Sequence, residues 1–148
     1  LYTYAGAPWR TQERLAQIVQ SQYKPSPDGL AGNDDLGQMS AWLVFTALGF
    51  YPVAPGSNEY VIGRPFVNRA VLNLPDGKRF AVVAEGLSDA NRYVGSVMLN
   101  GAPLDRTFIR DGEIRAGGEL RFTMQASPNR AWGTARSARP YSMSTASE

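Results

Sequence analysis

Residues 39–48, MSAWLVFTAL, constrain the fold of this chain most, because they leave almost no polar face. The stretch predicts a helix over about 36–49, ended by Gly49 and by Pro52 beyond it. A helix that is apolar all round has to be covered on every side. The rest of a 148-residue chain can cover one side. We therefore expect part of the covering to come from outside this chain, as for one helix cut from an α/α barrel.

A proline- and glycine-rich loop over residues 24–32 precedes this helix and delivers Asn33, Asp34 and Asp35 to it. Two interpretations of Asp35 stay open on residue types alone. Asp35 and Gln38 have the spacing of a capping box, which is the more frequent use of such a pair. Asp35 can equally be a catalytic carboxylate on a rigid support. Asp34 alone fits a solvated loop charge, and the acidic pair beside Asn33 also fits water or a hard cation, although not with calcium-loop spacing.

The remaining periodicity predicts an α+β fold. Pro8 suits the first turn of an amphipathic helix over about 9–23, whose apolar face carries Leu15, Ile18 and Val19. Beyond residue 57 the period falls to about two, which predicts short strands at 60–62, 70–74, 80–84, 95–99, 107–109 and 120–125. We expect the two helices to pack on one antiparallel sheet of about five strands, as a two-layer sandwich.

These elements predict one domain over 1–126, with a helical part at 1–52 and a strand-rich part at 57–126. The Ser-, Arg- and Pro-rich residues 127–148 predict a loosely ordered tail. Because the chain begins at Leu1 without a signal-like segment, we expect a fragment or a processed product.

Composition excludes several classes of function. The sequence has no Cys and no His, which removes disulfides, the usual zinc sites, cysteine nucleophiles and Ser-His-Asp schemes. A net charge of +2 with dispersed arginines argues against nucleic-acid binding. The apolar runs are too short and too interrupted to cross a bilayer. Any acid–base chemistry therefore falls to carboxylates, Tyr or Lys.

Four motifs in fixed order resemble one enzyme family. Residues 29–65 read GLAGNDDLGQMSAWLVFTALGFYPVAPGSNEYVIGRP, preceded by YAGAPWRTQ at 4–12 and followed by LNG at 99–101 and GGEL at 117–120. Together they resemble the C-terminal part of the catalytic region of glycoside hydrolase family 92, the calcium-dependent exo-α-mannosidases. The resemblance implies an inverting hydrolase that removes terminal, α-1,2-linked mannose from glycans.

The resemblance assigns roles residue by residue. Asp35 falls at the general base, which activates water. Asn33 falls where some members carry a second water-holding Asp, and as an amide it orients water but cannot take its proton. Asp34 has a supporting role at most. The resemblance implies calcium as cofactor, with ligands that cannot be placed in this chain, and a general acid upstream of Leu1. The missing partners are then the upstream catalytic region and an N-terminal β-sandwich domain, and the isolated chain is expected to be inactive.

Three residues of the first helix are candidate contacts to the sugar. Trp9 can stack on a pyranose ring, although large aromatic residues are more often packed. Arg10 and Gln12 can contact the rim of the site, with exposed helix surface as the alternative. The family further implies a bacterial protein, periplasmic or secreted.

A second class of function remains open. The alternative interpretations of the strand-rich part are a non-catalytic carbohydrate-binding module, with Tyr60, Tyr93 and Trp132 on an aromatic face, and a purely structural domain. The helical third of the chain argues against a binding module, because it is too long and too apolar to be an accessory element of a β-rich domain.

Overall fold

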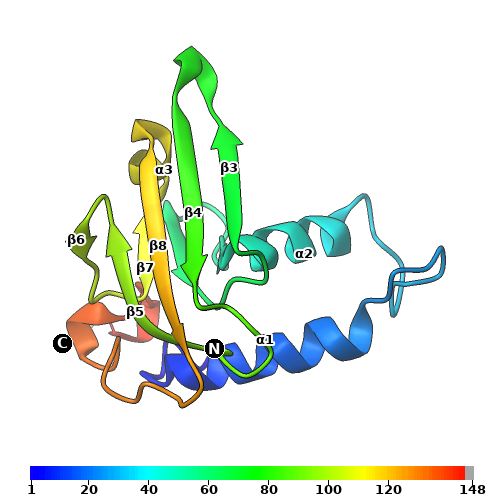
Figure 1. The fold of residues 1–148 in the computed structure, drawn as a ribbon, viewed down its shortest axis with the longest axis horizontal. Coiled ribbons are helices and arrows are strands. Elements are labelled where there is room, and N and C mark those ends of the chain that lie inside the picture. Colours follow the sequence, from blue (N-terminus) through cyan, green and yellow to red (C-terminus); the bar gives the residue numbers. More distant parts are fainter. Residues whose placement is uncertain (146–148) are drawn as a thin grey trace.

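Residues 1–145 are described by a computed structural model. The helices are α1 (Pro8–Gln22), α2 (Gln38–Leu48) and α3 (Asp111–Ala116), with 3-10 turns at Pro75–Gly77, Arg136–Ala138 and Met143–Thr145. The strands are β1 (Phe50–Tyr51), β2 (Glu59–Ile62), β3 (Arg69–Asn73), β4 (Arg79–Glu85), β5 (Tyr93–Leu99), β6 (Ala102–Pro103), β7 (Phe108–Arg110) and β8 (Gly118–Gln125). Figure 1 shows α1 and α2 beside the strands, with the loop between them projecting away from the sheets. The α+β class is confirmed.

The strands form two sheets where a single antiparallel sheet was predicted. The smaller sheet has the order β1-β2-β7 and the larger β3-β4-β8-β5-β6. Most neighbours pair antiparallel, but β4 and β8 run parallel, with Phe80 opposite Gly118 and Glu85 opposite Thr123. The prediction of one wholly antiparallel sheet is therefore wrong. Turn residues reveal which strands follow one another closely, whereas the pairing of β4 with β8 joins segments separated by three other strands and a helix.

One hydrophobic core joins the two sheets. Alternate residues of β4 and β8 point into it, and Phe80, Val82, Leu120 and Phe122 are each fully buried. The smaller sheet adds further apolar side chains, including Phe50, Ile62 and Ile109. Phe45 and Leu48 of α2 pack against this cluster. The core therefore lies between the sheets and the C-terminal half of α2.

Helix α1 buries a stripe that only partly matches the predicted one, since Leu15 and Val19 are half-buried. Pro8 occupies its first turn as expected, but the buried residues of the helix are Pro8, Gln12 and Ala16. Ile18, on the predicted apolar face, is 38% exposed. The contact of α1 with β5 decides this, because Gln12 is used as a hydrogen-bonding residue inside the interface.

Helix α2 ends as predicted and is incompletely covered, as predicted. Gly49 adopts φ 91° at its C-terminus, and its N–H points to the carbonyls of Phe45 and Thr46. Thr46 is the only residue of α2 that is fully buried. Val44 is 61% exposed. Within residues 1–145, a strongly apolar helix thus keeps an uncovered side.

Two further expectations are corrected by the structure. No helix was predicted between the strands at 107–109 and 120–125, but residues 111–116 form α3, whose start is stabilised by Glu113 accepting from the backbone N–H of Arg110 at 2.8 Å. The predicted loose tail is packed at least to residue 140. Trp132 is buried and its Nε1 donates to the Leu104 carbonyl at 2.8 Å, and Thr107 donates to the Ala138 carbonyl through both N–H and hydroxyl.

Residues 146–148, the end of that predicted tail, lie outside the described part of the chain. Among the described residues, no helix combines the length and apolar character needed to cross a membrane.

Candidate functional site

The loop between α1 and α2 is built from two parts. In the first, Tyr23 and Leu30 form an isolated antiparallel bridge, and the Lys24 N–H donates to the Gly29 carbonyl at 2.8 Å. A Cβ on Gly29 would lie 2.0 Å from the Lys24 carbonyl oxygen, so this closed turn requires glycine. The second part, residues 31–37, carries the acidic pair into α2.

Asp34 anchors the start of α2. Its carboxylate accepts one hydrogen bond from the Ser40 N–H and one from the Ser40 hydroxyl, each at 2.8 Å. The N–H of Met39 adds a longer bond, 3.3 Å, to the Asp34 carbonyl. The bonds from Ser40, first the backbone N–H and then the hydroxyl, lower the pKa of the Asp34 carboxyl below its usual value. Asp34 therefore remains ionised and satisfies an N–H of the first helical turn.

Asp35 does not cap the helix, so the capping-box interpretation is wrong. The residue before the first turn is Gly37, at φ 91° and without a side-chain cap. Asp35 and Leu36 both adopt positive φ, 46° and 62°, which turns the chain so that Asp34 reaches Ser40. Known helix-capping motifs do not place the two bonded residues six positions apart, so the sequence did not predict the hydrogen bonds between Asp34 and Ser40.

The same turn leaves Asp35 free. Its side chain is exposed, and within residues 1–145 its carboxylate has no hydrogen-bond or ion-pair partner. Leu36 beside it is fully exposed, and Asn33 is exposed as well. Positive φ at a non-glycine residue is uncommon, and in Leu36 it is combined with a side chain that packs on nothing in this chain. Strain of this kind is concentrated at functional sites.

Two aromatic rings brace α2 against the end of α1. Tyr23 stacks on Trp42 with ring centroids 5.6 Å apart and planes inclined by 11°. The Tyr23 hydroxyl donates to the Met39 carbonyl at 3.1 Å. Burial, followed by the negative charge of Asp34, raises the pKa of Tyr23. These contacts hold the first half of α2, the helix that follows Asp35, against the end of α1.

The predicted sugar contacts lie at the other end of α1. Trp9 is half-buried and Arg10 is exposed, both on the first turn. Gln12 is 3% exposed, and its side-chain oxygen accepts from the Val94 N–H at 3.1 Å, so it joins α1 to β5. At 1.5 Å per residue, Trp9 stands about 20 Å along the helix from Tyr23. Asn33, Asp34 and Asp35 are thus brought together, but Trp9, Arg10 and Gln12 are not brought to them.

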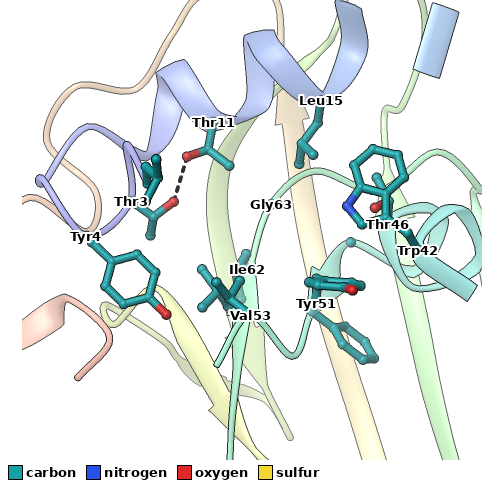
Figure 2. A pocket seen from close by; sticks show the side chains of 14 residues that line it. Thr3, Tyr4, Thr11, Leu15, Trp42, Thr46, Tyr51, Val53, Ile62 and Gly63 are labelled. Carbon is teal, nitrogen blue, oxygen red and sulfur yellow. Dashed lines mark hydrogen bonds between the residues drawn. The ribbon is translucent and has the colours of Figure 1, made fainter. Parts of the chain in front are cut away.

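A cavity of about 150 Å³ lies between α1, α2 and the smaller sheet. Figure 2 shows Leu15, Trp42, Tyr51 and Ile62 around it, with Thr3 and Thr11 hydrogen-bonded to each other at one side. Among residues 1–145, no Asp, Glu, Lys or Arg side chain lines the cavity. It offers mainly apolar contact, with the Tyr4 and Tyr51 side chains also in its lining and no carboxylate.

The described residues contain no group of three or more His, Cys, Asp or Glu side chains that could hold a metal ion. The carboxylates of this part of the chain therefore do not form a calcium site by themselves.

The aromatic face of the alternative binding module is absent from this arrangement. Trp132 is buried, and Tyr60 packs against Phe45 and Phe50 with ring centroids 6.1 and 5.8 Å away. Tyr93 donates to Glu13 of α1 at 2.9 Å. The three rings are used for packing or bonding in separate places, so they do not present one sugar-binding surface.

Comparison with known proteins identifies similar chains. The model of the family described as glycosyl hydrolase family 92 catalytic domain matches residues 1–126. A protein of Arthroderma benhamiae described as an uncharacterized secreted glycosidase is 32% identical over 146 residues, which cover 97% of this chain and 19% of that protein.

Two solved structures from Bacteroides thetaiotaomicron are also similar. The GH92 inverting mannosidase BT2199 has a TM-score of 0.90 and 41% identity, covering 97% of this chain and 19% of that one. The GH92 alpha-mannosidase BT3965, in complex with mannoimidazole, has a TM-score of 0.91 and 40% identity, covering 96% of this chain and 19% of that one. This chain therefore spans only 19% of the length of these relatives.

Proposed function

The chain belongs to the glycosyl hydrolase family 92 catalytic domain family, and we propose that it is the C-terminal portion of an enzyme that hydrolyses terminal α-linked mannose from glycans. Its similarity to an inverting mannosidase and an alpha-mannosidase supports this substrate class and an inverting reaction. The proposed linkage is α-1,2. The proposed partners are the rest of the catalytic region and an N-terminal β-sandwich domain.

The single observation that carries the proposal is the difference between two adjacent carboxylates. Both carboxylate oxygens of Asp34 accept hydrogen bonds from Ser40. Asp35, in contrast, is exposed, has a positive φ, and its carboxylate has no bonding partner within residues 1–145. An unpartnered carboxylate on rigid support is free to accept a proton from water. Asp35 is the proposed general base, and Asp34 is a positioning residue that holds the turn.

In an inverting hydrolysis the base and acid stand on opposite sides of the sugar, roughly 6.5–9.5 Å apart, with the attacking water beside the base. Asp35 takes a proton as the water oxygen bonds to the anomeric carbon. The bond to the leaving oxygen breaks, and that oxygen receives a proton from the general acid. Asp34 is unsuited to be that acid, because its lowered pKa keeps it ionised. The acid is therefore proposed to lie outside residues 1–145.

The other candidates have secondary roles in this proposal. Asn33 can orient the water but cannot deprotonate it. Trp9 and Arg10 remain predicted substrate contacts, but from the other end of α1 they can contact only a part of the glycan away from the mannose beside Asp35. Gln12 is assigned no sugar contact, because its side-chain oxygen is taken by Val94.

Calcium is proposed as a cofactor of the longer enzyme, where it would bind sugar hydroxyls and help to distort the ring. We propose that the enzyme is exported from the cell, since a relative is described as secreted. Bacterial origin, with a periplasmic or extracellular location, remains an expectation from the family resemblance.

The test uses Asp35→Asn in the longer enzyme, with Asp28→Asn as the matched control in the same loop. Asp28 is exposed and forms no hydrogen bond with the helix. Loss of a general base lowers kcat by about 10²–10⁴-fold, with a smaller change in KM, while the control stays near wild type. Retention of wild-type kcat in Asp35→Asn rules out the assignment.

Two further assays complete the test. Proton NMR of the first-formed mannose distinguishes the reaction course, because inversion of an α-mannoside releases the β anomer first. The isolated 148-residue chain is expected to be inactive on an aryl α-mannoside with calcium present. Turnover clearly above buffer contradicts that expectation.

A further inference from the structure

Arg64 is a buried arginine held in a fixed loop. It lies two residues after the end of β2 and is 7% exposed. The residues on either side are tied to the end of α2, because the Gly63 N–H donates to the Gly49 carbonyl at 2.9 Å and the Phe66 N–H to the Ala47 carbonyl at 3.0 Å. Pro65 further restricts the backbone. The position of the guanidinium is therefore built into the fold.

Within residues 1–145 this guanidinium has no hydrogen-bonding partner. Its Nε is buried and unpaired, and none of its nitrogens forms an ion pair. The guanidinium lies over the face of Phe66, with Cζ 4.3 Å from the ring centroid. Arg106 and Arg121, by contrast, pair with Glu113 and Glu119. A buried charge is costly unless it is paired and hydrogen-bonded.

The charges around Arg64 do not neutralise it. Burial is the main cause that lowers the pKa of Arg64, and the positive charge of Arg92 lowers it further, whereas Asp89 acts in the opposite direction. Asp89 lies within electrostatic range, but it forms no ion pair with Arg64. Two positive charges, Arg64 and Arg92, thus lie near the single negative charge of Asp89, which cannot neutralise both.

We propose that Arg64, assisted by Arg92, is a binding site for an oxyanion. The guanidinium presents N–H donors in a planar fork, which matches the oxygens of a carboxylate or a phosphate-like group. The buried Nε supplies a donor that this chain leaves unused. The oxyanion is either a carboxylate, from a ligand or from an acidic side chain elsewhere in the longer enzyme, or a free tetrahedral anion.

This site is separate from the Asp35 loop. Arg64 lies by the C-terminal end of α2, through the bonds of Gly63 and Phe66, whereas Asp34 and Asp35 lie at its N-terminal end. The eleven residues of α2 span about 16 Å at 1.5 Å each. The proposal of an oxyanion site can therefore be tested independently of the proposed mannosidase activity.

The experiment follows the Arg64 side chain by NMR in the 148-residue chain labelled with ¹⁵N-arginine. Sodium acetate, phosphate and sulfate are titrated at constant ionic strength against sodium chloride. The Arg64 Nε–H signal is expected to move saturably with an oxyanion and not with chloride. Response to acetate identifies a carboxylate site, and response to phosphate or sulfate alone identifies a tetrahedral anion.

Variants test which residues carry the binding. Arg64→Met removes the response, and Arg92→Met weakens binding by about two- to fivefold, as expected for the loss of a nearby charge that is not directly bonded. Arg69→Met, at an exposed position on β3, leaves it unchanged. Should Arg64→Met fail to fold by circular dichroism, Arg64→Lys keeps the charge but lacks the fork, and weaker binding is expected.

The wild-type titration decides the proposal by itself. A non-saturating Arg64 shift, or one that chloride reproduces, overturns it, as does an unchanged response in a folded Arg64→Met or Arg64→Lys chain. Neither result bears on turnover by Asp35, because no mannoside is present in the assay.

Discussion

Both oxygens of the Asp34 carboxylate accept hydrogen bonds from Ser40, one from its backbone N–H and one from its hydroxyl, each at 2.8 Å. This pair, and not Asp35, holds the first turn of α2. The adjacent residue is thereby released from a structural task. One aspartate fixes the helix, and its neighbour is the proposed general base.

Asp34→Ala is expected to lower the melting temperature of the chain, and Ser40→Ala to lower it by a smaller amount, since the Ser40 N–H bond survives in the second variant. Because the two side chains bond to each other, the double variant is expected to lose less than the sum of the single losses. Thermal unfolding followed by circular dichroism measures the three losses. Strict additivity contradicts a direct interaction.

Acid is expected to remove the same stabilisation. The folded-state pKa of Asp34 lies below its usual value. The pKa of Glu113 is also lowered, since hydrogen bonds from Arg106 and the Arg110 N–H outweigh the upward effect of burial. Groups of this kind stabilise the fold above their unfolded pKa, near 4, and the contribution disappears as pH falls through the folded pKa. Urea unfolding from pH 6 to pH 2 measures the loss, which is smaller in Asp34→Ala than in the wild type.

Gln12→Ala is expected to destabilise the fold rather than to weaken sugar binding. It leaves the buried Val94 N–H without its acceptor, at a cost of roughly 1–3 kcal/mol. Gln20→Ala, at an exposed position of α1, should change stability by about 0.5 kcal/mol or less. Urea unfolding gives both values. A raised KM in the longer enzyme, with normal stability, would restore Gln12 as a substrate contact.

Two glycines with similar φ should differ sharply on substitution. Gly49 is at φ 91°, and an added Cβ would lie 3.0 Å from Phe122 Cζ and 3.1 Å from the Pro65 nitrogen. Gly77 is at φ 71° with nothing within 4 Å. Gly77→Ala incurs only the left-handed penalty of about 1–2 kcal/mol. Gly49→Ala adds overpacking of the core, for a total of roughly 2–5 kcal/mol. Equal losses in urea unfolding would show that the contact with Phe122 is not tight.

Residues beyond 126 are expected to be required for stability. Trp132→Ala opens a cavity and costs roughly 3–5 kcal/mol. Trp132→Phe leaves the Leu104 carbonyl without its donor and costs roughly 1–3 kcal/mol. Tyr141→Ala, at a 63% exposed side chain, serves as the control. A chain truncated after residue 126 that melts like the full chain would argue against this packing.

The sequence by itself determined the elements whose signals are local. Pro8 and Gly49 set the beginning of α1 and the end of α2 through restrictions on their own backbones. A period of about two predicted the strands at 70–74 and 80–84, which pair as β3 and β4, since the signal for each lies in neighbouring residues. The motifs also indicated the family, because they are compared as ordered residues and need no coordinates.

Only the tertiary structure decided the relationships between distant segments. The parallel pairing of β4 with β8, the burial of Trp132 and the use of Gln12 by Val94 depend on contacts between residues far apart in the chain. The choice of Asp34 over Asp35 as the anchor also needed three dimensions. Adjacent aspartates are equivalent in composition, and the positive φ of Asp35 and Leu36 determines which carboxylate reaches Ser40.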